Sequence, residues 1–477
     1  MSLENAFKQW KETGKMPFSI IQGGMGAGVS DYGLARTVSS LGQFGVVSGT
    51  APEAKMVQEL QQGDRNGEIR FALSKFPNQE IAQSIIDKYF VEGGRKEGYL
   101  GIPFPTLKTE GKVAEIANQH LENLVVAGSF AEVFLAKQGH SNPVGINLLY
   151  KIQWPLLAGV YGAMLADVDM ILMGAGLATD VPPAIDAFSR GESASINLDV
   201  TNSKGYSIRF DPSRIIKVDS LNKPMFNGIV SLDLAAKILK NADGYVMEGP
   251  IAGGHNPNPR NHKINETGQP DYTAKDDVNF AKLYEILNGR PFWLAGAYAG
   301  KLKEALALGA AGVQIGTPFA YSKDSHMRDD LRKKALAEIM AGATVFTDPR
   351  ASPTRYPFKV NQISGTLSEK DVYDNRKRVC NKGYLVEWYE GHDGNLKSRC
   401  PSEPVDLYVK KGGELEETKG RKCLCNGLLT TIGAGSPNEP PLLTSGADFS
   451  VLKELVAMHG MDYTAKHAID LMLEKSR

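Results

Sequence analysis

The sequence has few cysteines, no net charge and no long apolar run. Four Cys among 477 residues are too few for a disulfide scaffold of this size, so we expect a reducing, cytoplasmic location. Lys and Arg number 54, as do Asp and Glu, which leaves no basic excess for nucleic acid. No stretch reaches the roughly 18 apolar residues of a membrane span, and the first fifteen residues lack the apolar core of a secretory leader. We therefore expect no nucleic-acid or membrane partner.

Hydrophobic residues make up 42% of the chain, and they occur in short runs separated by helical patterns. Short apolar strands that alternate with amphipathic helices indicate a parallel sheet that is covered on its outer face. Eight such units favour a closed (β/α)₈ TIM barrel over an open sheet. The eight predicted strands are 18–22, 43–49, 144–148, 169–173, 225–230, 244–248, 291–295 and 312–315.

Two regions depart from this alternation. Residues 52–120 carry polar stretches and a helical pattern, and we interpret them as a helical insertion into a barrel that spans residues 1–329. A polar hairpin is expected at 194–222. From 330 to 477 the barrel pattern is absent, and we predict a C-terminal extension that packs on the barrel and holds every cysteine of the chain.

A glycine-rich loop, Gly23–Gly28, follows the first predicted strand. Small residues allow backbone to approach a flat ligand closely. The spacing does not match a dinucleotide fingerprint, because an acidic partner for a ribose is missing where one would be expected. Taken alone, the loop is more typical of an ordinary strand-to-helix turn.

Two further small-residue loops follow the seventh and eighth strands, at 293–298 and 312–319. Barrels often bind phosphate there through backbone N–H groups and a helix N-terminus. Gly296, Ala297, Gly316 and Thr317 suit that role. The competing interpretation is tight closure of the barrel by small residues.

The sixth strand ends in Glu248-Gly-Pro-Ile-Ala-Gly-Gly-His255. An imidazole at that place can accept a proton or donate a hydrogen bond to a developing anion. A lone loop histidine is more often bonded to backbone, but loops after barrel strands line active sites. The position at a strand end favours a catalytic role for His255.

These segments together resemble the nitronate monooxygenase family, also called 2-nitropropane dioxygenases. The resemblance covers about residues 17–325 and is strongest at Ile20-Ile-Gln-Gly-Gly-Met-Gly, Gly145-Ile-Asn-Leu, Ala252-Gly-Gly-His and Gly309-Ala-Ala-Gly-Val-Gln-Ile-Gly-Thr. The length indicates a long, divergent branch, related to the enoyl reductase subunits of polyunsaturated fatty acid synthases. The usual strand-six motif has Gln where this chain has Glu248 and Glu where it has Ile251.

The resemblance implies FMN as cofactor and places His255 near the reactive face of the flavin. It puts Asn147 near the polar edge of the ring and assigns the phosphate to the loops after strands seven and eight. The cofactor-binding residues that we predict are Gln22, Gly23, Gly24, Met25, Gly26, Asn147, Glu248, Gly253, Gly254, Ala295, Gly296, Ala297, Gln314, Gly316 and Thr317.

The expected activity is that of an FMN-dependent oxidoreductase. Oxidation of a nitronate or similar small acid, with O₂ reoxidising the flavin, is the leading hypothesis. The alternative is an NAD(P)H-dependent reductase of an enoyl thioester or quinone, with an acyl carrier protein as partner for a thioester. A barrel scaffold without catalysis is the third interpretation. A homodimer is expected from the base rates of symmetric oligomers.

The extension carries two further features. Cys380, Cys400, Cys423 and Cys425 could bind zinc or an iron–sulfur cluster as thiolates, but their spacing fits neither a zinc ribbon nor a ferredoxin, so we expect no metal. Residues 346–358 contain three prolines and two arginines, which suits either a cap on the barrel mouth or a plain connecting loop.

Overall fold

Eight parallel strands close into a barrel in the computed structural model, which describes residues 2–96 and 98–477. Their order in the sheet is β1-β13-β12-β11-β10-β6-β5-β2. Phe44 closes the ring between β1 and β2, since its O accepts from the N of Gln22 at 2.9 Å and its N donates to the O of Ile20 at 3.0 Å. The predicted TIM barrel is confirmed. The strands are β1 (Ile20–Gln22), β2 (Gly45–Ser48), β5 (Val144–Leu149), β6 (Met170–Gly174), β10 (Met225–Val230), β11 (Gly244–Glu248), β12 (Phe292–Ala295) and β13 (Gly312–Ile315).

Helices connect these strands, and several begin where the sequence supplies a side-chain cap. Asp31 accepts from the N of Leu34 at 3.0 Å, and Asn118 and Asn279 cap their helices in the same way. A carboxylate or amide oxygen there satisfies an N–H that has no partner inside the helix. The connecting helices are α2 (Tyr32–Ser40), α3 (Pro52–Gln61), α6 (Gln119–Ala136), α7 (Gln153–Leu165), α8 (Val181–Ser189), α9 (Asp233–Ile238), α10 (Phe280–Leu287), α11 (Leu302–Ala307) and α12 (Thr317–Ala320).

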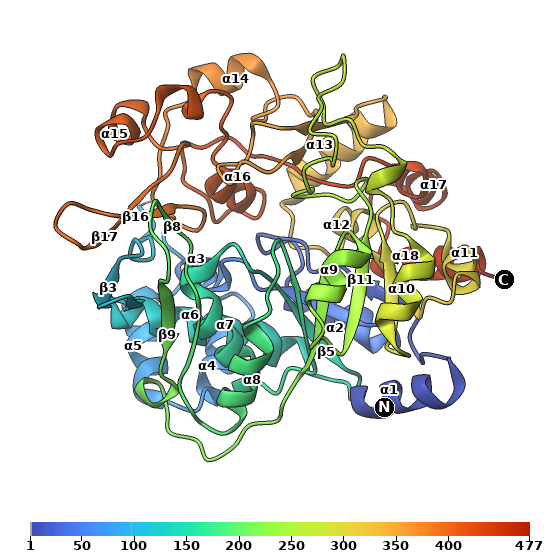
Figure 1. Ribbon diagram of the computed structural model, residues 1–477, viewed down its shortest axis with the longest axis horizontal. Helices are drawn as coiled ribbons and strands as arrows, with labels where there is room; N and C mark the ends of the chain where they lie inside the picture. Colours follow the sequence, from blue (N-terminus) through green and yellow to red (C-terminus); the bar gives the residue numbers. More distant parts are fainter. Residues whose placement is uncertain (1, 97) are drawn as a thin grey trace.

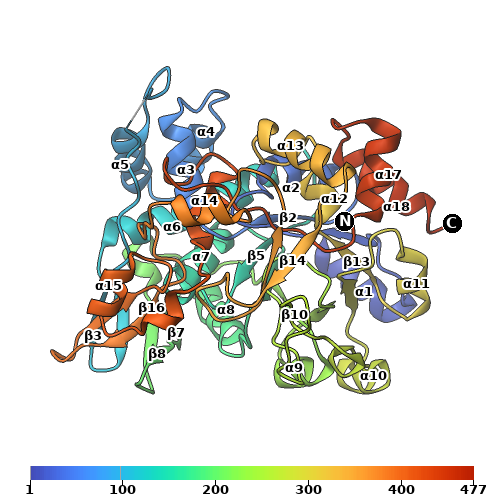
Figure 2. The ribbon, with the colours of Figure 1, turned by 90° about the horizontal axis from the view of Figure 1, so that it is seen from above.

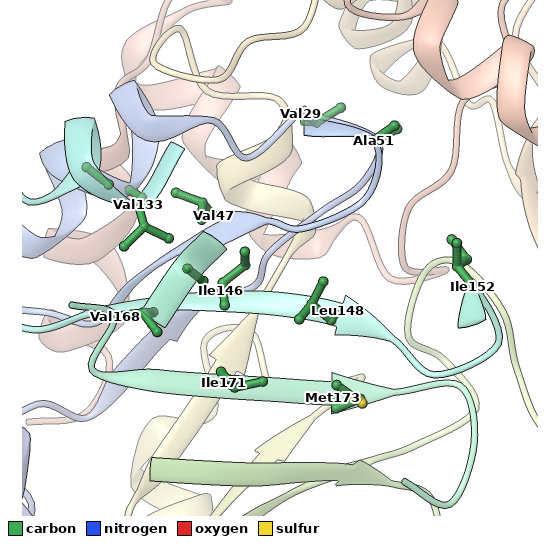
Figure 3. Packing of buried hydrophobic residues seen from close by; sticks show 14 of the residues in the cluster. Val29, Val47, Ala51, Val133, Ile146, Leu148, Ile152, Val168, Ile171 and Met173 are labelled. Atoms are coloured by element: carbon green, nitrogen blue, oxygen red, sulfur yellow. The ribbon is translucent and has the colours of Figure 1, made fainter. Parts of the chain in front are cut away.

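Residues of each strand alternate between two apolar layers. Outward residues pack against the helices: Figure 3 shows Ile146 and Leu148 of β5 beside Ile171 and Met173 of β6 within this layer. Inward residues fill the barrel with a second cluster that includes Ile21, Val46, Leu172, Val246 and Trp293. The alternation follows from the period of two of a β-strand.

One short helix closes the amino-terminal end of the barrel. Leu3 and Phe7 of α1 (Leu3–Thr13) belong to the inner cluster, and the ring of Phe7 lies 6.2 Å from that of Trp293. Phe18 stacks on the other side of this indole at 6.0 Å. The opposite end of the barrel, at the carboxyl-terminal ends of the strands, is left open for a ligand.

The insertion contains a hairpin in addition to its helices. After α4 (Glu68–Lys75) and α5 (Gln79–Tyr89) it forms a hairpin of β3 (Leu107–Glu110) and β4 (Val113–Ile116). The hairpin pairs with the predicted polar excursion at 194–222, because β4 runs parallel to β9 (Ser207–Phe210). That excursion also holds β7 (Ala194–Asn197), β8 (Val200–Thr201) and the 3₁₀ turn Pro212–Arg214. Four short strands from two distant segments thus build one sheet, in the order β3-β4-β9-β7.

The extension lies over the carboxyl-terminal end of the barrel, where its orange elements cross the upper part of Figure 1. Both views place α17 and α18 on the side of the molecule opposite to β3 (Figure 2). One extension strand, β16, pairs in parallel with β8. The elements are α13 (Asp329–Met340), β14 (Val345–Asp348), β15 (Phe358–Asn361), α14 (Lys370–Asn375), β16 (Glu387–Glu390), β17 (Leu396–Arg399), α15 (Val405–Lys410), α16 (Leu424–Thr430), α17 (Ser450–His459) and α18 (Ala465–Glu474), with 3₁₀ turns at Ala274–Asp276 in the barrel and Leu415–Thr418.

Within the described ranges, 2–96 and 98–477, every helix falls short of the length and apolarity that crossing a bilayer requires.

Truncating the inner cluster should destabilise the fold much more than truncating the surface. We expect Leu172→Ala to lower the free energy of unfolding by about 2–5 kcal/mol, since it leaves a cavity inside the barrel. Leu234→Ala is the matched control, because Leu234 is 56% exposed on α9. Urea unfolding followed by tryptophan fluorescence measures both. Equal losses in the two variants would contradict the assignment of Leu172 to the barrel interior.

Candidate active site

A cavity of about 1910 Å³, including its open mouth, lies at the carboxyl ends of the barrel strands. Its floor consists of glycine-rich loops from the barrel, and its roof consists of apolar side chains from the extension. The roof residues are Tyr384, Leu385, Leu424, Leu428, Leu429, Leu442 and Leu443. The cavity is thus shared between the two parts of the chain.

Inward-facing residues at the ends of the strands make the floor polar. Glu248 pairs in register with Ala295, and Ala295 pairs with Gln314. Each stands two residues after an inward residue of the same strand, so the period of two turns it toward the barrel axis. Asn147 occupies the same place on β5. The predicted residues Asn147, Glu248, Ala295 and Gln314 all line the cavity.

Two of these side chains carry buried oxygens without a hydrogen-bond partner in the described part of the chain. They are Oδ1 of Asn147 and Oε1 of Gln314. The Nδ2 of Asn147 donates to the O of Gly24 at 3.1 Å, which fixes the amide against the glycine loop. An unpaired buried acceptor costs about 1–3 kcal/mol, so both oxygens indicate that a ligand with N–H or O–H donors belongs here.

The loop after β1 approaches the cavity closely because it lacks side chains. A Cβ added at Gly24 would collide with the Cβ of Asn147 and lie 3.0 Å from a methyl of Val46. Ser30 holds the loop in place: its Oγ donates to the O of Gly23 at 2.8 Å and accepts from the N of Met25 at 2.8 Å. Gly23, Gly24, Met25 and Gly26 all line the cavity, as predicted for the floor.

Gln22 departs from its predicted place, because it does not line the cavity. Its neighbour Ile21 faces the barrel interior, so Gln22 faces outward. Its amide is fully buried, accepts from the N of Val46 at 3.1 Å and donates to the Oγ of Ser30 at 2.8 Å. Gln22 therefore holds the glycine loop from the outer side of the barrel, away from the cavity.

The loops after β12 and β13 present backbone amides to the cavity. Gly296 and Ala297 both have positive φ, +69° and +73°, and this conformation is uncommon for alanine. In the described part of the chain, no group accepts a hydrogen bond from the backbone amides of Gly296, Ala297, Gly316 or Thr317. The lining includes no Lys or Arg. An anion here would be bound by neutral donors.

His255 lines the cavity. Its Nε2 lies 2.7 Å from the Oγ of Ser352, and its ring meets that of Phe358 edge-on at 4.8 Å between centroids. Burial, with a smaller contribution from the nearby Lys151 ammonium, lowers the pKa of His255 to about 3. The imidazole is therefore neutral at physiological pH.

The segment 346–358 reaches this part of the cavity, which agrees with the capping interpretation. The N of Asn256 donates to the O of Pro357, and the N of Lys359 donates to the O of Gly254, each at 2.9 Å. Its two arginines face away from the cavity, because Arg350 and Arg355 form ion pairs with glutamates of the extension. The segment thus contributes Ser352 and Phe358 to the site but no positive charge.

Glu248 is a carboxyl group without a partner. Neither a hydrogen bond nor an ion pair involves its side chain in the residues that the structure covers. Burial alone raises the pKa of Glu248 to about 7. The cavity floor therefore holds one neutral base and one weak acid on a single loop, 248–255.

A further wall of the cavity was not predicted. Thr444, Ser445 and Gly446 of the extension line it beside the loops after β11 and β13. The N of Ala447 donates to the O of Ile251 at 3.0 Å, which anchors this segment. Its small residues are a weak signal by themselves, and the sequence holds no indication that they return to the barrel.

The four cysteines come from three segments that hydrogen bonds hold together. Ser402 donates to the O of Lys422 at 2.8 Å, and Asn426 donates to Oδ1 of Asn381 at 2.8 Å. All four thiols are free. Within the described chain no group of three or more His, Cys, Asp or Glu side chains is arranged to hold a metal ion. Cys425 also lines the cavity.

No protein-family model matches this sequence, and no curated protein matches it. Among solved structures, the chain is similar to FabK from Thermotoga maritima, with 14% identity, 96% of this chain and 93% of that chain covered, and a TM-score of 0.48. It is similar to the enoyl reductase domain of MlnA from Bacillus amyloliquefaciens, with 10% identity, 98% and 97% covered, and a TM-score of 0.49. It is also similar to nitroalkane oxidase from Streptomyces ansochromogenes, with 12% identity, 98% and 97% covered, and a TM-score of 0.44.

The floor should tolerate no added side chain at Gly24. We expect Gly24→Ala to lower the free energy of unfolding by about 1–3 kcal/mol, since the new methyl group must displace Asn147. Gly101→Ala is the control, because a Cβ there meets nothing within 4 Å. Urea unfolding of the two variants and the wild type is the measurement. A Gly24→Ala protein as stable as wild type would show that the loop is looser than described.

Proposed function

We propose that this chain is an FMN-dependent oxidoreductase. The observation that carries the proposal is the pairing of two cavity features, unpartnered acceptors on the floor and a cradle of free amides without cations at one end. An isoalloxazine ring is flat and offers an N–H donor, and a phosphate monoester accepts from backbone amides. The residues present therefore fit FMN.

Separate parts of the cavity would hold the two ends of the cofactor. Gly23, Gly24 and Met25 leave room for a flat ring beside Asn147, and Gln314 offers an acceptor from the facing strand. The amides of 296–297 and 316–317 would hold the phosphate. When bound, the flavin supplies the redox chemistry, and the protein supplies orientation and proton transfer.

His255 and Glu248 divide the acid–base work. His255 is neutral and can take a proton from a carbon acid in the cavity, while Ser352 orients its ring. Glu248 keeps a proton near neutral pH and can donate it. Burial thus leaves His255 without a proton and Glu248 with one near neutral pH, which are the forms that a base and an acid require. A base at this place suits a neutral carbon acid, such as the nitro compound from which a nitronate forms, and we therefore favour oxidation of a nitronate or similar small acid, with O₂ as final electron acceptor.

A second candidate is favoured by the roof. Leucines from α16 and from residues 442–443 cover the cavity, so a substrate with a hydrocarbon chain would bury apolar surface there. Such a substrate suits an NAD(P)H-dependent reductase of an enoyl thioester or a quinone. A thioester substrate would bring an acyl carrier protein to the cavity mouth as partner.

An anaerobic absorbance titration separates these candidates. The purified protein with FMN is titrated with a nitronate in one cuvette and with NADH or NADPH in another. Bleaching of the flavin by the nitronate alone supports the first candidate, and bleaching by a nicotinamide alone supports the second. Protein that binds no added FMN would remove both and leave a scaffold role.

Loss of the imidazole should remove the base. We expect His255→Ala to lower kcat by about 10²–10⁴-fold with little change in FMN affinity, because His255 is not one of the residues that we assign to the ring or the phosphate. His262→Ala is the control, since His262 is exposed on the loop that follows. Steady-state kinetics with the substrate found by titration gives the answer. Unchanged turnover of His255→Ala would exclude the imidazole as the base.

Glu248 should set the pH dependence. As pH rises through about 7, its carboxyl loses the proton that it donates, so kcat/KM of the wild type should fall. The pKa of His255, about 3, leaves that group neutral through this window. Glu248→Gln has no proton to release, so its rate should be lower and flat across the same pH range. A pH profile of Glu248→Gln that keeps the decline near 7 would assign it to another group.

A further inference from the structure

Two threonines of the cavity lining, Thr317 of the barrel and Thr444 of the extension, form hydrogen bonds between the two parts of the chain. The Oγ1 of Thr317 accepts from the N of Gly446 at 2.9 Å, and the Oγ1 of Thr444 accepts from the N of Gly254 at 2.8 Å. Each hydroxyl thus bonds to an amide of the other part of the chain. Both residues line the cavity.

Each of these hydroxyls retains a proton to donate. A threonine hydroxyl has one O–H donor and two acceptor lone pairs, and an amide already occupies an acceptor position in both residues. No hydrogen bond donated by either hydroxyl occurs among the described residues. Each hydroxyl can therefore donate a hydrogen bond to a ligand in the cavity.

The surroundings suit an anion. The free amides of 296–297 and 316–317 belong to the same wall as Thr317. One charge opposes an anion: the carboxylate of Asp448 also lines the cavity, and it accepts from the N of Ser450 at 2.8 Å. Charge-assisted hydrogen bonds from hydroxyls and amides are the usual means of binding a phosphate without a cation.

The segment that carries Thr444 is held in place by the barrel. Gly253 lacks a side chain where a Cβ would lie 2.7 Å from the carbonyl carbon of Ser445, so the two backbones touch. The Oγ of Ser445 donates to Oδ1 of Asn361 at 3.0 Å on the buried side. Thr444 is therefore positioned as firmly as the barrel loops that it faces.

We propose that Thr444 is a phosphate-binding residue, and that the extension completes the cofactor site of the barrel. The ligand group is the phosphate monoester of FMN, so this inference rests on the proposed function. Thr444 donates its hydroxyl proton to the phosphate and Thr317 does the same from the opposite side. The extension is then part of the cofactor site, in addition to roofing the cavity.

The test compares FMN with riboflavin, which lacks the phosphate. Apoprotein of the full chain is titrated with each ligand, and quenching of flavin fluorescence gives the Kd. We expect Thr444→Val, which keeps the shape and removes the hydroxyl, to weaken FMN binding about tenfold or more and to leave riboflavin binding unchanged. Thr444→Ser should restore FMN binding.

Thr431→Val is the matched control. Thr431 also lines the cavity, but its hydroxyl donates to the O of Leu428 at 2.6 Å and has no proton left for a ligand. Its Kd for FMN should equal that of the wild type. Thermal unfolding of each apoprotein shows whether a variant is folded, and Thr444→Ala, which also lacks the hydroxyl, supplies the answer if Thr444→Val is not.

Two results would overturn the inference. If Thr444→Val weakens the binding of FMN and of riboflavin equally, the hydroxyl has a structural role. If the Kd of both ligands is unchanged, the hydroxyl does not contribute to binding. Wild-type protein that binds neither ligand would instead remove the proposed function, and the inference with it. Wild type that binds FMN while Thr444→Val and Thr444→Ser bind it equally well refutes the inference alone.

Discussion

The register between parallel strands is the constraint on which the site depends. Because β11, β12 and β13 pair residue by residue, Glu248, Ala295 and Gln314 reach the barrel axis at one level. A slip of one residue along any of these strands would turn its polar end residue into the outer apolar layer. The packing of inward residues around Trp293 resists such a slip, since it would bury the wrong face of each strand. Core packing below the cavity therefore fixes the chemistry above it.

Much of the barrel could be predicted from the sequence because parallel strands leave a strong signal. Each is short, apolar and bounded by small or polar residues, and each predicted segment overlaps a strand of the closed sheet. The loops that follow the strands inherit their place from this topology, which is why His255 and Gly296 were found. Gln22 was misplaced because it follows an inward residue directly, and strand phase rather than family resemblance decides where its side chain points.

Contacts between distant segments left no comparable signal. The hairpin of β3 and β4 consists of residues that alternate weakly, and its partner β9 lies about ninety residues further along the chain. Propensity describes one segment at a time, whereas such a sheet depends on which edge is available in the folded molecule. The return of Thr444 to Gly254 is of the same kind, a single hydrogen bond across 190 residues. Roles for the extension could therefore be assigned only from the structure.

The described lining of the cavity includes no Lys or Arg, and the ammonium of Lys151 nearby adds to the effect of burial on His255. A lysine or arginine near Glu248 would stabilise its carboxylate and lower its pKa, and the acid would be lost. A carboxylate near His255 would raise the pKa of the imidazole and hold a proton on it. Burial therefore keeps both groups in their neutral forms near neutral pH, and an anion would bind to amides and hydroxyls, which carry no net charge.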